Sequence, residues 1–367
     1  MTAHNPNNER VKRQYFAYLK EATRYSEASV DHVAQALSRF EADTSYRDFK
    51  TFHPELAVAF KRRLADCVSQ SSGQKLSKAT LHHTLAHLKR FFLWLAGQPG
   101  YRSRLRYSDA DYFNLTAKDA RVATARREKI YPTLEQVQHV ISQMAHHTDV
   151  ERRNRALVAF TLLTGARDSA IASMKLKHVD VASGKVSQDA REVRTKYSKT
   201  FTTYFFPVGG NCRDIVVDWV DYLRRERLWG NDDPLFPATA VALGAGRQFE
   251  PTGLRKEHWK SAAPIRAIFK SAFNAAGVPY FNPHSLRHTL VHFGEAICIT
   301  PEDFKSWSQN LGHEGVLTTF CSYGAVASRR QGEIIHGLAR PVPVTPEISE
   351  AALVAALRKL AASDRIP

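Results

Sequence analysis

Apolar residues recur at intervals of three and four through much of the first hundred residues, and this spacing predicts amphipathic helices. The segments 30–42, 54–68 and 78–97 all show the pattern. In segment 78–97 one stripe contains Leu81, Leu85, Leu88, Phe92 and Leu95. Ser77 is a suitable N-cap for that helix, and Gly97 is a suitable stop. This part of the chain is therefore expected to be helical.

Helical spacing returns beyond residue 130. Segment 132–145 has it, and 154–176 predicts a buried helix that breaks at Thr164–Gly165 before a new helix begins. The tail, 345–363, again has an apolar stripe. The stripe does not identify the partner of this tail helix, so docking on its own subunit and docking on a neighbouring one are both open.

Strands are expected between these helices. Residues from about 179 to 207 are rich in Thr, Tyr and Phe and partly alternate, and Ser183–Gly184 is a suitable hairpin turn. After Pro207 the helical pattern resumes around an expected Gly-, Ala- and Pro-rich loop near 234–253.

The predicted fold class is mainly α with a small antiparallel β-sheet. We expect a helical domain over 1–115, a basic linker over 116–130, an α+β domain over 131–340 and a tail helix over 341–367. The linker is assigned because basic residues are frequent there and apolar clusters are few.

The amino-acid composition indicates the class of binding partner. Lys and Arg total 52 against 36 Asp and Glu, which gives a net charge of +16 and a pI near 9.7. Such a balance favours a polyanion such as double-stranded DNA. The four cysteines are dispersed and form no CxxC, as expected for reduced thiols. The first residues show no secretory leader and no apolar run is long enough to span a membrane, so a cytoplasmic, nucleoid-associated protein with no membrane contact is expected.

Candidate chemistry lies in five residues: Arg167 in TGAR, His284 and Arg287 in HSLR, His313 in LGH, and Tyr323. Arginine can grip two phosphate oxygens at once, and histidine can hold or transfer a proton near neutral pH. A tyrosine hydroxyl has a pKa of about 10 and becomes a nucleophile if a basic site removes its proton. The set suits chemistry at a phosphodiester.

The order TGAR, SKT, HSLRH, LGH and Tyr closely resembles that of the tyrosine recombinases, the phage integrase family, over roughly residues 130–335. The resemblance implies a helical core-binding domain followed by an α+β catalytic domain. It also implies that Arg167 and Arg287 clamp the scissile phosphate and that His284 accepts or orients the nucleophile's proton. His313 would bond a phosphate oxygen, and Tyr323 would form a 3′-phosphotyrosine. Neither ATP, metal nor another cofactor is implied.

The family also uses a lysine on a β-hairpin as the general acid for the leaving 5′-oxygen. Lys199 is the preferred candidate, and Lys196 is the alternative. Strand parity is expected to separate them, because residues three apart in a strand point to opposite faces. Two departures stand out: Ala170 replaces the acidic residue usual three positions after the first arginine, leaving Asp168 as the nearest acid, and the spacing from His313 to Tyr323 is one residue longer than usual.

Further DNA contacts are expected from charge alone, at Lys89, Arg90, Arg126, Arg127, Lys129 and Lys196. The spacing of His284, His288 and His292 would also suit a metal-binding helix face, but neither HExxH nor an obvious carboxylate ligand accompanies it, so a metal site is not preferred and His288 is expected to be packed.

The predicted function is a site-specific recombinase or integrase, with a mobile genetic element preferred as its source. Alternatives are a chromosome-dimer-resolving recombinase, a type IB topoisomerase-like enzyme, and a non-catalytic DNA-binding regulator of the same fold. The resemblance implies a homo-tetramer on DNA, with a monomer or weak oligomer when free and accessory recombination proteins as further partners.

Overall fold

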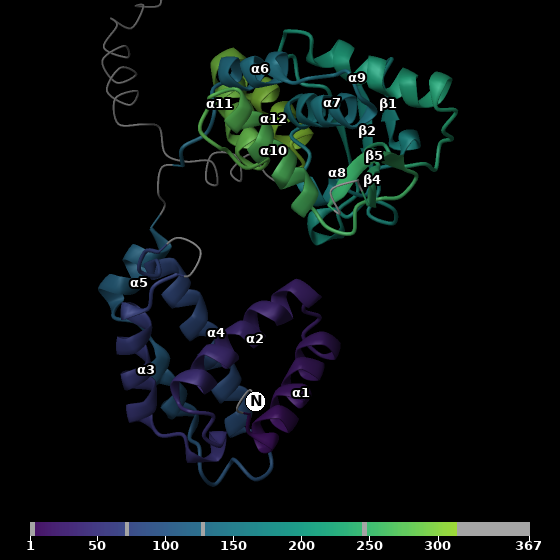
Figure 1. Ribbon diagram of the computed structural model, residues 1–367. Coiled ribbons are helices and arrows are strands. Elements are labelled where there is room, and N and C mark those ends of the chain that lie inside the picture. The colour runs from purple at the N-terminus through teal and green to yellow at the C-terminus, as the bar shows by residue number, and fades with distance from the viewer. Residues whose placement is uncertain (1–3, 70–72, 126–128, 244–247, 314–367) are drawn as a thin grey trace, which may run out of the picture. The chain divides into compact units, whose positions relative to one another are not determined.

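The computed structural model describes residues 4–69, 73–125, 129–243 and 248–313 (Figure 1). The chain divides into two compact units, Met1–Arg126 and Arg127–Pro367. Each unit has its own hydrophobic core. The predicted separation into a helical part and a mixed part follows from these two cores, and each unit is considered by itself.

Unit 1 is entirely helical apart from short turns among its described residues. Its helices are α1 (Pro6–Glu21), α2 (Glu27–Asp43), α3 (Pro54–Asp66), α4 (Lys78–Ala96) and α5 (Ala117–Thr124), with 3-10 turns η1 (Phe49–Thr51) and η2 (Tyr107–Phe113). The stripe predicted on 78–97 is buried, and Ser77 Oγ accepts the Thr80 N–H at 3.1 Å as the N-cap. Edge-to-face rings, including Phe40 against Phe92 and Phe113, fill the core.

The segment expected as a linker contains a helix. Residues 117–124 form α5, in which Thr116 is the N-cap and no residue is buried. The expectation of little core in this segment agrees with that exposure. Arg126 and Arg127 lie outside the described residues.

Unit 2 is built around the long buried helix α7, Asp149–Thr164 (Figure 1). Its other helices are α6 (Leu134–Gln143), α8 (Asp168–Ile171), α9 (Cys212–Asp221), α10 (Ala263–Ala275), α11 (Ser285–Ile297) and α12 (Pro301–Asn310), with α7 spanning Asp149–Thr164. Shorter turns are η3 (Leu176–His178), η4 (Lys196–Ser198) and the π-helical η5 (Tyr222–Glu226). Because α7 packs against α6, α9 and α11, nearly all of its faces are apolar.

Two antiparallel sheets complete unit 2. β1 (Val179–Asp180), β2 (Lys185–Gln188) and β3 (Phe201–Tyr204) form one sheet in that order. The predicted turn at Ser183–Gly184 joins β1 to β2, and Gly184 has φ +65°, which suits glycine.

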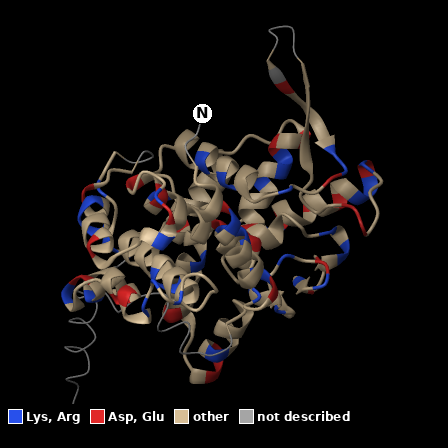
Figure 2. Ribbon diagram, turned by 90° about the horizontal axis from the view of Figure 1, so that it is seen from below, with Lys and Arg blue, Asp and Glu red and all other residues tan. Residues whose placement is uncertain are grey.

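The second sheet corrects an expectation. The region near 234–253, expected to be a loop, contains β4 (Ala238–Leu243) paired with β5 (Phe249–Arg255), with a bulge between Ala240 and Val241. In Figure 2 this hairpin extends away from the rest of the unit. Its Gly, Ala and Pro content concealed the pairing, because strand formation here depends on the cross-strand partner rather than on local propensity. Within the described parts of the chain, no helix is long and apolar enough to cross a membrane.

Candidate active site

The LGH sequence forms the end of helix α12. Gly312 has φ +72°; its N–H donates to Gln309 O at 2.7 Å, and the His313 N–H donates to Ser308 O at 3.2 Å. This pair of bonds is a Schellman motif, which requires a left-handed residue and therefore favours glycine. The motif turns the chain sharply and places His313 beside the helix end.

The TGAR sequence forms a comparable end to helix α7. Gly165 is left-handed at φ +58°, and the Ala166 N–H donates to Thr164 Oγ1 at 3.1 Å. Arg167 follows in an extended conformation as the N-cap of α8. The predicted break at Thr164–Gly165 is confirmed, and it places Arg167 between two helices.

Arg287 joins these two helix ends. Its guanidinium donates to Gly165 O at 2.5 Å and to Leu311 O at 2.6 Å, and its side chain lies within 3.0 Å of His313 Nε2. The residue is only 2% exposed. The C-terminal ends of helices carry partial negative charge, so two such ends stabilise the buried cation. Hydrogen bonds to a charged donor contribute about 1.5–3 kcal/mol each, so this arginine is held rigidly.

His313 is neutral at physiological pH. Desolvation by burial, and then the positive charges of Arg287, Arg167 and Lys199, lower its pKa to about 3. Because a guanidinium can only donate, His313 Nε2 accepts, and the ring proton lies on Nδ1. The residues whose charges lower the pKa of His313 span more than a hundred positions of the chain. The structure therefore assembles TGAR, SKT, HSLR and LGH around one point.

His284 lies at the N-cap of helix α11, three residues before Arg287. The residue is exposed to solvent. Partial desolvation comes first and the charges of Arg287, Arg167 and Lys129 follow, and together they lower the pKa of His284. A neutral imidazole at this position can accept a proton. Lys129 is exposed, and its charge reaches the same histidine.

The acidic residue that the family usually has three positions after the first arginine is absent here, and the nearest acid pairs with another arginine. Ala170 is buried in the core of unit 2, whereas Asp168 accepts the Arg266 Nε–H at 2.8 Å. Asp168 also acts electrostatically on His284. Sequence reasoning did not identify Arg266, because its distance from Asp168 along the chain carries no local signal.

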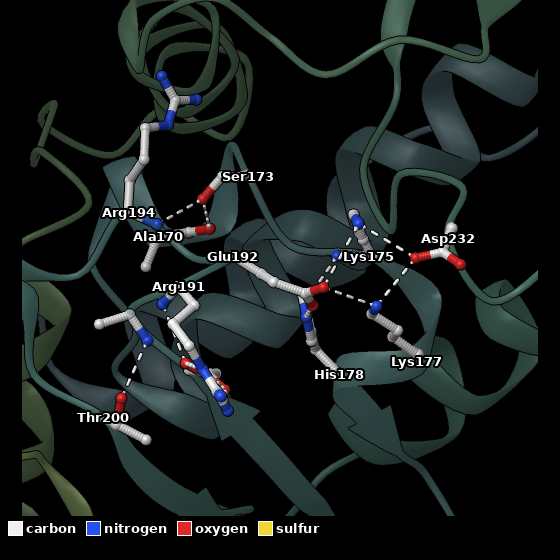
Figure 3. Close-up of polar contacts among 12 residues, drawn as sticks. Ala170, Ser173, Lys175, Lys177, His178, Arg191, Glu192, Arg194, Thr200 and Asp232 are labelled. Atoms are coloured by element: carbon white, nitrogen blue, oxygen red, sulfur yellow. Dashed lines mark hydrogen bonds and ion pairs between the residues drawn. The ribbon is translucent and has the colours of Figure 1, made fainter.

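The connection between β2 and β3 carries both candidate lysines, and it is anchored to the body of unit 2 (Figure 3). The Arg194 N–H donates to Ser173 Oγ at 2.9 Å, and Glu192 lies 2.8 Å from both Lys177 and His178. At the base, the Ala190 N–H donates to Thr200 Oγ1 at 3.1 Å. These contacts hold the two ends of the connection.

The strand-parity expectation for the lysines is wrong, because neither lies in a strand. Lys196 begins the short turn η4, and Lys199 precedes β3. Between them Tyr197 and Ser198 are left-handed, with φ 60° and 50°. The two ammonium groups consequently lie 4.7 and 5.9 Å from the centre of the same Tyr197 ring. Lys199, but not Lys196, is among the charges that lower the pKa of His313, which supports the preference for Lys199.

Asn310 links the histidine turn to the lysine hairpin. Its side-chain oxygen accepts the Tyr204 N–H at 2.6 Å, and its amide donates to Tyr204 O at 2.8 Å. Thr203 Oγ1 donates to Asn310 O at 3.0 Å. Asn310 thus pairs with the edge of β3 as a strand would. Sequence reasoning missed this residue, although its position directly before LGH was a usable signal.

Two of the residues predicted to contact DNA bond other side chains of their own unit. Lys89 bonds Asp111 and Asn114, and Arg90 bonds the Tyr25 hydroxyl, all within unit 1. These contacts do not test the DNA-binding role predicted for Lys89 and Arg90, which stays a prediction. Tyr323 lies outside the described residues.

The histidines of α11 pack around the start of unit 2. The Tyr131 ring stacks on His292 at 4.5 Å, and His288 is buried beside it. His292 also bonds Glu295 at 2.7 Å. Among the residues that the structure describes, no cluster of three or more His, Cys, Asp or Glu could hold a metal ion.

The assembled site can be compared with known proteins. The profile of the phage integrase family matches residues 133–328, which is more than half of the chain. The chain belongs to the phage integrase family. Members of this tyrosine recombinase family are enzymes that cleave and rejoin DNA.

Curated relatives and solved structures agree with this assignment. Tyrosine recombinase XerC of Lactobacillus delbrueckii subsp. bulgaricus is 25% identical over 315 residues, covering 84% of this chain and 92% of that protein. XerC of Corynebacterium efficiens is 25% identical over 255 residues, 69% of each chain.

The structural neighbours confirm the predicted fold class. XerH recombinase bound to palindromic difH has a TM-score of 0.59 at 17% identity, covering 90% of this chain and 85% of that one. A lambda integrase dimer bound to a COC′ core site gives 0.58 at 13%, covering 88% and 82%. The Tn1549 transposon integrase with right-end DNA gives 0.57 at 13%, covering 90% and 99%.

Proposed function

We propose that this chain is a site-specific recombinase that cuts and rejoins duplex DNA through a 3′-phosphotyrosine formed by Tyr323. The observation that carries the proposal is the convergence of Arg167, Arg287 and Lys199 on the buried, neutral His313. Three cations whose charges act on one histidine suit the binding of a phosphodiester. The order of the motifs places Tyr323 ten residues after His313, close enough in sequence to reach the same pocket.

In the proposed step the Tyr323 oxygen attacks phosphorus, and the bond from phosphorus to the 5′-oxygen breaks. His284 accepts the tyrosine proton, and Lys199 supplies a proton to the departing 5′-oxygen. Arg167 and Arg287 stabilise the charge that develops on the phosphoryl oxygens. One phosphodiester replaces another, so the bond energy is retained and neither ATP nor a cofactor enters the balance. Religation is the same step in reverse.

Covalent capture tests this proposal. The full chain is incubated in EDTA with nicked suicide duplexes that carry the ends of its native locus, and adducts are resolved on a denaturing gel. We expect an adduct at the 3′-phosphate from the wild type and from Tyr280→Phe, a matched tyrosine variant, but none from Tyr323→Phe. An adduct that survives Tyr323→Phe moves the nucleophile to another tyrosine and contradicts the assignment.

Covalent capture, duplex binding and plasmid relaxation together separate the other classes. A DNA-binding regulator of this fold binds the duplexes without forming an adduct. A type IB topoisomerase-like enzyme relaxes supercoiled plasmid that lacks any specific site. A metal-dependent hydrolase on the α11 histidines loses its activity in EDTA.

We further propose that the enzyme acts for a mobile genetic element, as a tetramer on two DNA sites. The fold shared with the Tn1549 transposon integrase is compatible with this role, and XerH recombinase has the same fold. A chromosome-dimer-resolving recombinase is the second candidate, and it is favoured by the likeness to XerC proteins over 84% of the chain. Recombination of plasmids that carry either the flanking junctions of the locus or a chromosomal terminus site distinguishes the two.

DNA contact at the start of unit 2 forms part of the same proposal. Lys129 is exposed, and its charge acts on both His284 and His288. A phosphate held by Lys129 would therefore lie next to the proposed proton acceptor. Arg126 and Arg127 are proposed as further contacts from charge alone.

A further inference from the structure

The apex of the β2–β3 connection has an unusual backbone. Tyr197 and Ser198 are consecutive left-handed residues, with φ 60° and 50°. Side chains with a Cβ disfavour this region, which Asn and Gly normally occupy in such turns. The Tyr197 side chain is 78% exposed, so burial of the ring does not offset the strain. Outliers of this kind concentrate at functional sites.

The strained turn gathers two cations on one ring. Lys196 Nζ lies 4.7 Å and Lys199 Nζ 5.9 Å from the centre of the Tyr197 ring. Two ammonium groups repel each other, and the negative face of an aromatic ring attracts both. In an extended strand the two lysines would point to opposite faces. The left-handed pair therefore determines where both ammonium groups lie.

The rest of the connection is held independently of Tyr197. The Arg194 guanidinium donates to Trp259 O at 2.8 Å and to Lys260 O at 2.9 Å. Thr200 accepts the Ala190 N–H across the base of the connection. These contacts do not involve residues 195–199, which form the apex. A change in the ring is consequently expected to move the lysines without unfolding the hairpin.

We propose that Tyr197 is a positioning residue whose ring holds the Lys199 ammonium on the active-site side of the β2–β3 connection, ready to protonate the leaving 5′-oxygen. The inference rests on the proposed role of Lys199 as the general acid. Tyr197 itself contacts neither the phosphate nor the nucleophile. It acts by limiting the orientations of the lysine.

The test uses single-turnover cleavage by the full chain on two suicide duplexes. One has the natural 5′-oxygen at the scissile phosphate, and the other has sulfur in that position. A thiolate is a much better leaving group than an alkoxide and needs no proton. A defect in general-acid catalysis therefore disappears with the sulfur substrate, whereas a defect in binding or folding remains.

Tyr197→Leu removes the ring while keeping an apolar side chain, and Tyr197→Phe is the matched control that keeps the ring. We expect Tyr197→Leu to slow cleavage of the oxygen substrate about two- to fivefold, the size of a cation–π contact at an exposed site. Cleavage of the sulfur substrate and DNA affinity should match the wild type, and Tyr197→Phe should match it throughout. Equal slowing on both substrates, or a loss of DNA affinity, would overturn the positioning role.

The variant Lys199→Ala distinguishes a failure of the positioning role of Tyr197 from a failure of the general-acid role of Lys199, on which it rests. If sulfur rescues Lys199→Ala but not Tyr197→Leu, Lys199 is the general acid and Tyr197 does not position it. If sulfur fails to rescue Lys199→Ala, the general-acid assignment itself is wrong. Rescue of both variants supports both statements.

Discussion

Gly312→Ala tests why the LGH turn needs glycine. The residue has φ +72°, and an added Cβ would lie 2.6 Å from Phe201 Cε2 and 2.7 Å from its Cζ. The left-handed conformation costs a Cβ-bearing residue about 1–2 kcal/mol. Insertion of a methyl group into a tightly packed contact costs about 1–3 kcal/mol. The free energy of unfolding should therefore fall by about 2–5 kcal/mol.

Gly277→Ala is the matched control, because Gly277 has nearly the same φ, +68°, with nothing within 4 Å of the added Cβ. Urea unfolding should show a loss of only about 1–2 kcal/mol for this variant. The double variant Gly312→Ala with Phe201→Leu should recover the steric part, as a coupling energy of about 1–3 kcal/mol in a double-mutant cycle.

Cleavage should fall together with stability. Phe201 lies two residues after Lys199, and His313 directly follows Gly312. Displacement of the ring therefore moves two proposed catalytic groups, and a shift near 1 Å costs about 10²-fold in rate. If Gly312→Ala destabilises the protein no more than Gly277→Ala and cleaves normally, close packing of the turn on β3 does not hold the site together, and the reasoning fails.

Three further predictions follow from other contacts. Asn310→Ala loses two hydrogen bonds to β3, and urea unfolding should show a loss of about 1–3 kcal/mol; an unchanged stability would mean that water replaces the amide. The folded-state pKa of His313 is about 3, below the unfolded value near 6.5, so stability is full above pH 6.5 and is lost as the pH falls. His313→Asn should remove about 2 kcal/mol of the stability difference between pH 7.5 and pH 5, and an identical pH profile would contradict the shift. Lys129→Glu should weaken DNA binding and lower the salt slope by about 1 in a filter-binding titration, whereas an unchanged slope would exclude a phosphate contact.

The local parts of this molecule could be predicted from sequence. The stripe in helix α4, its Ser77 cap and the helix end at Gly165 depend on rules that act over a few residues. These local predictions are confirmed because capping, left-handed turns and helical periodicity need no distant partner. The order of the motifs also pointed to Arg167, Lys199 and Arg287, whose charges lower the pKa of His313. The catalytic roles of these residues stay predictions.

The remaining features depend on contacts between distant segments. Sequence alone did not indicate that Arg287 bonds Gly165 O, 122 positions away, or that Asn310 pairs with the edge of β3. The β4–β5 hairpin was hidden because its residues have weak strand propensity and its stability comes from pairing.

The turn that carries Lys196 and Lys199 shows most clearly that local sequence does not determine side-chain orientation. Lys196 and Lys199 were expected on opposite faces of a strand, yet they share the Tyr197 ring across two left-handed residues. The sequence by itself determined which groups are available for the chemistry and where the helices end. Tertiary structure alone decided their mutual orientation, because a strained turn persists only when the surrounding contacts hold both of its ends.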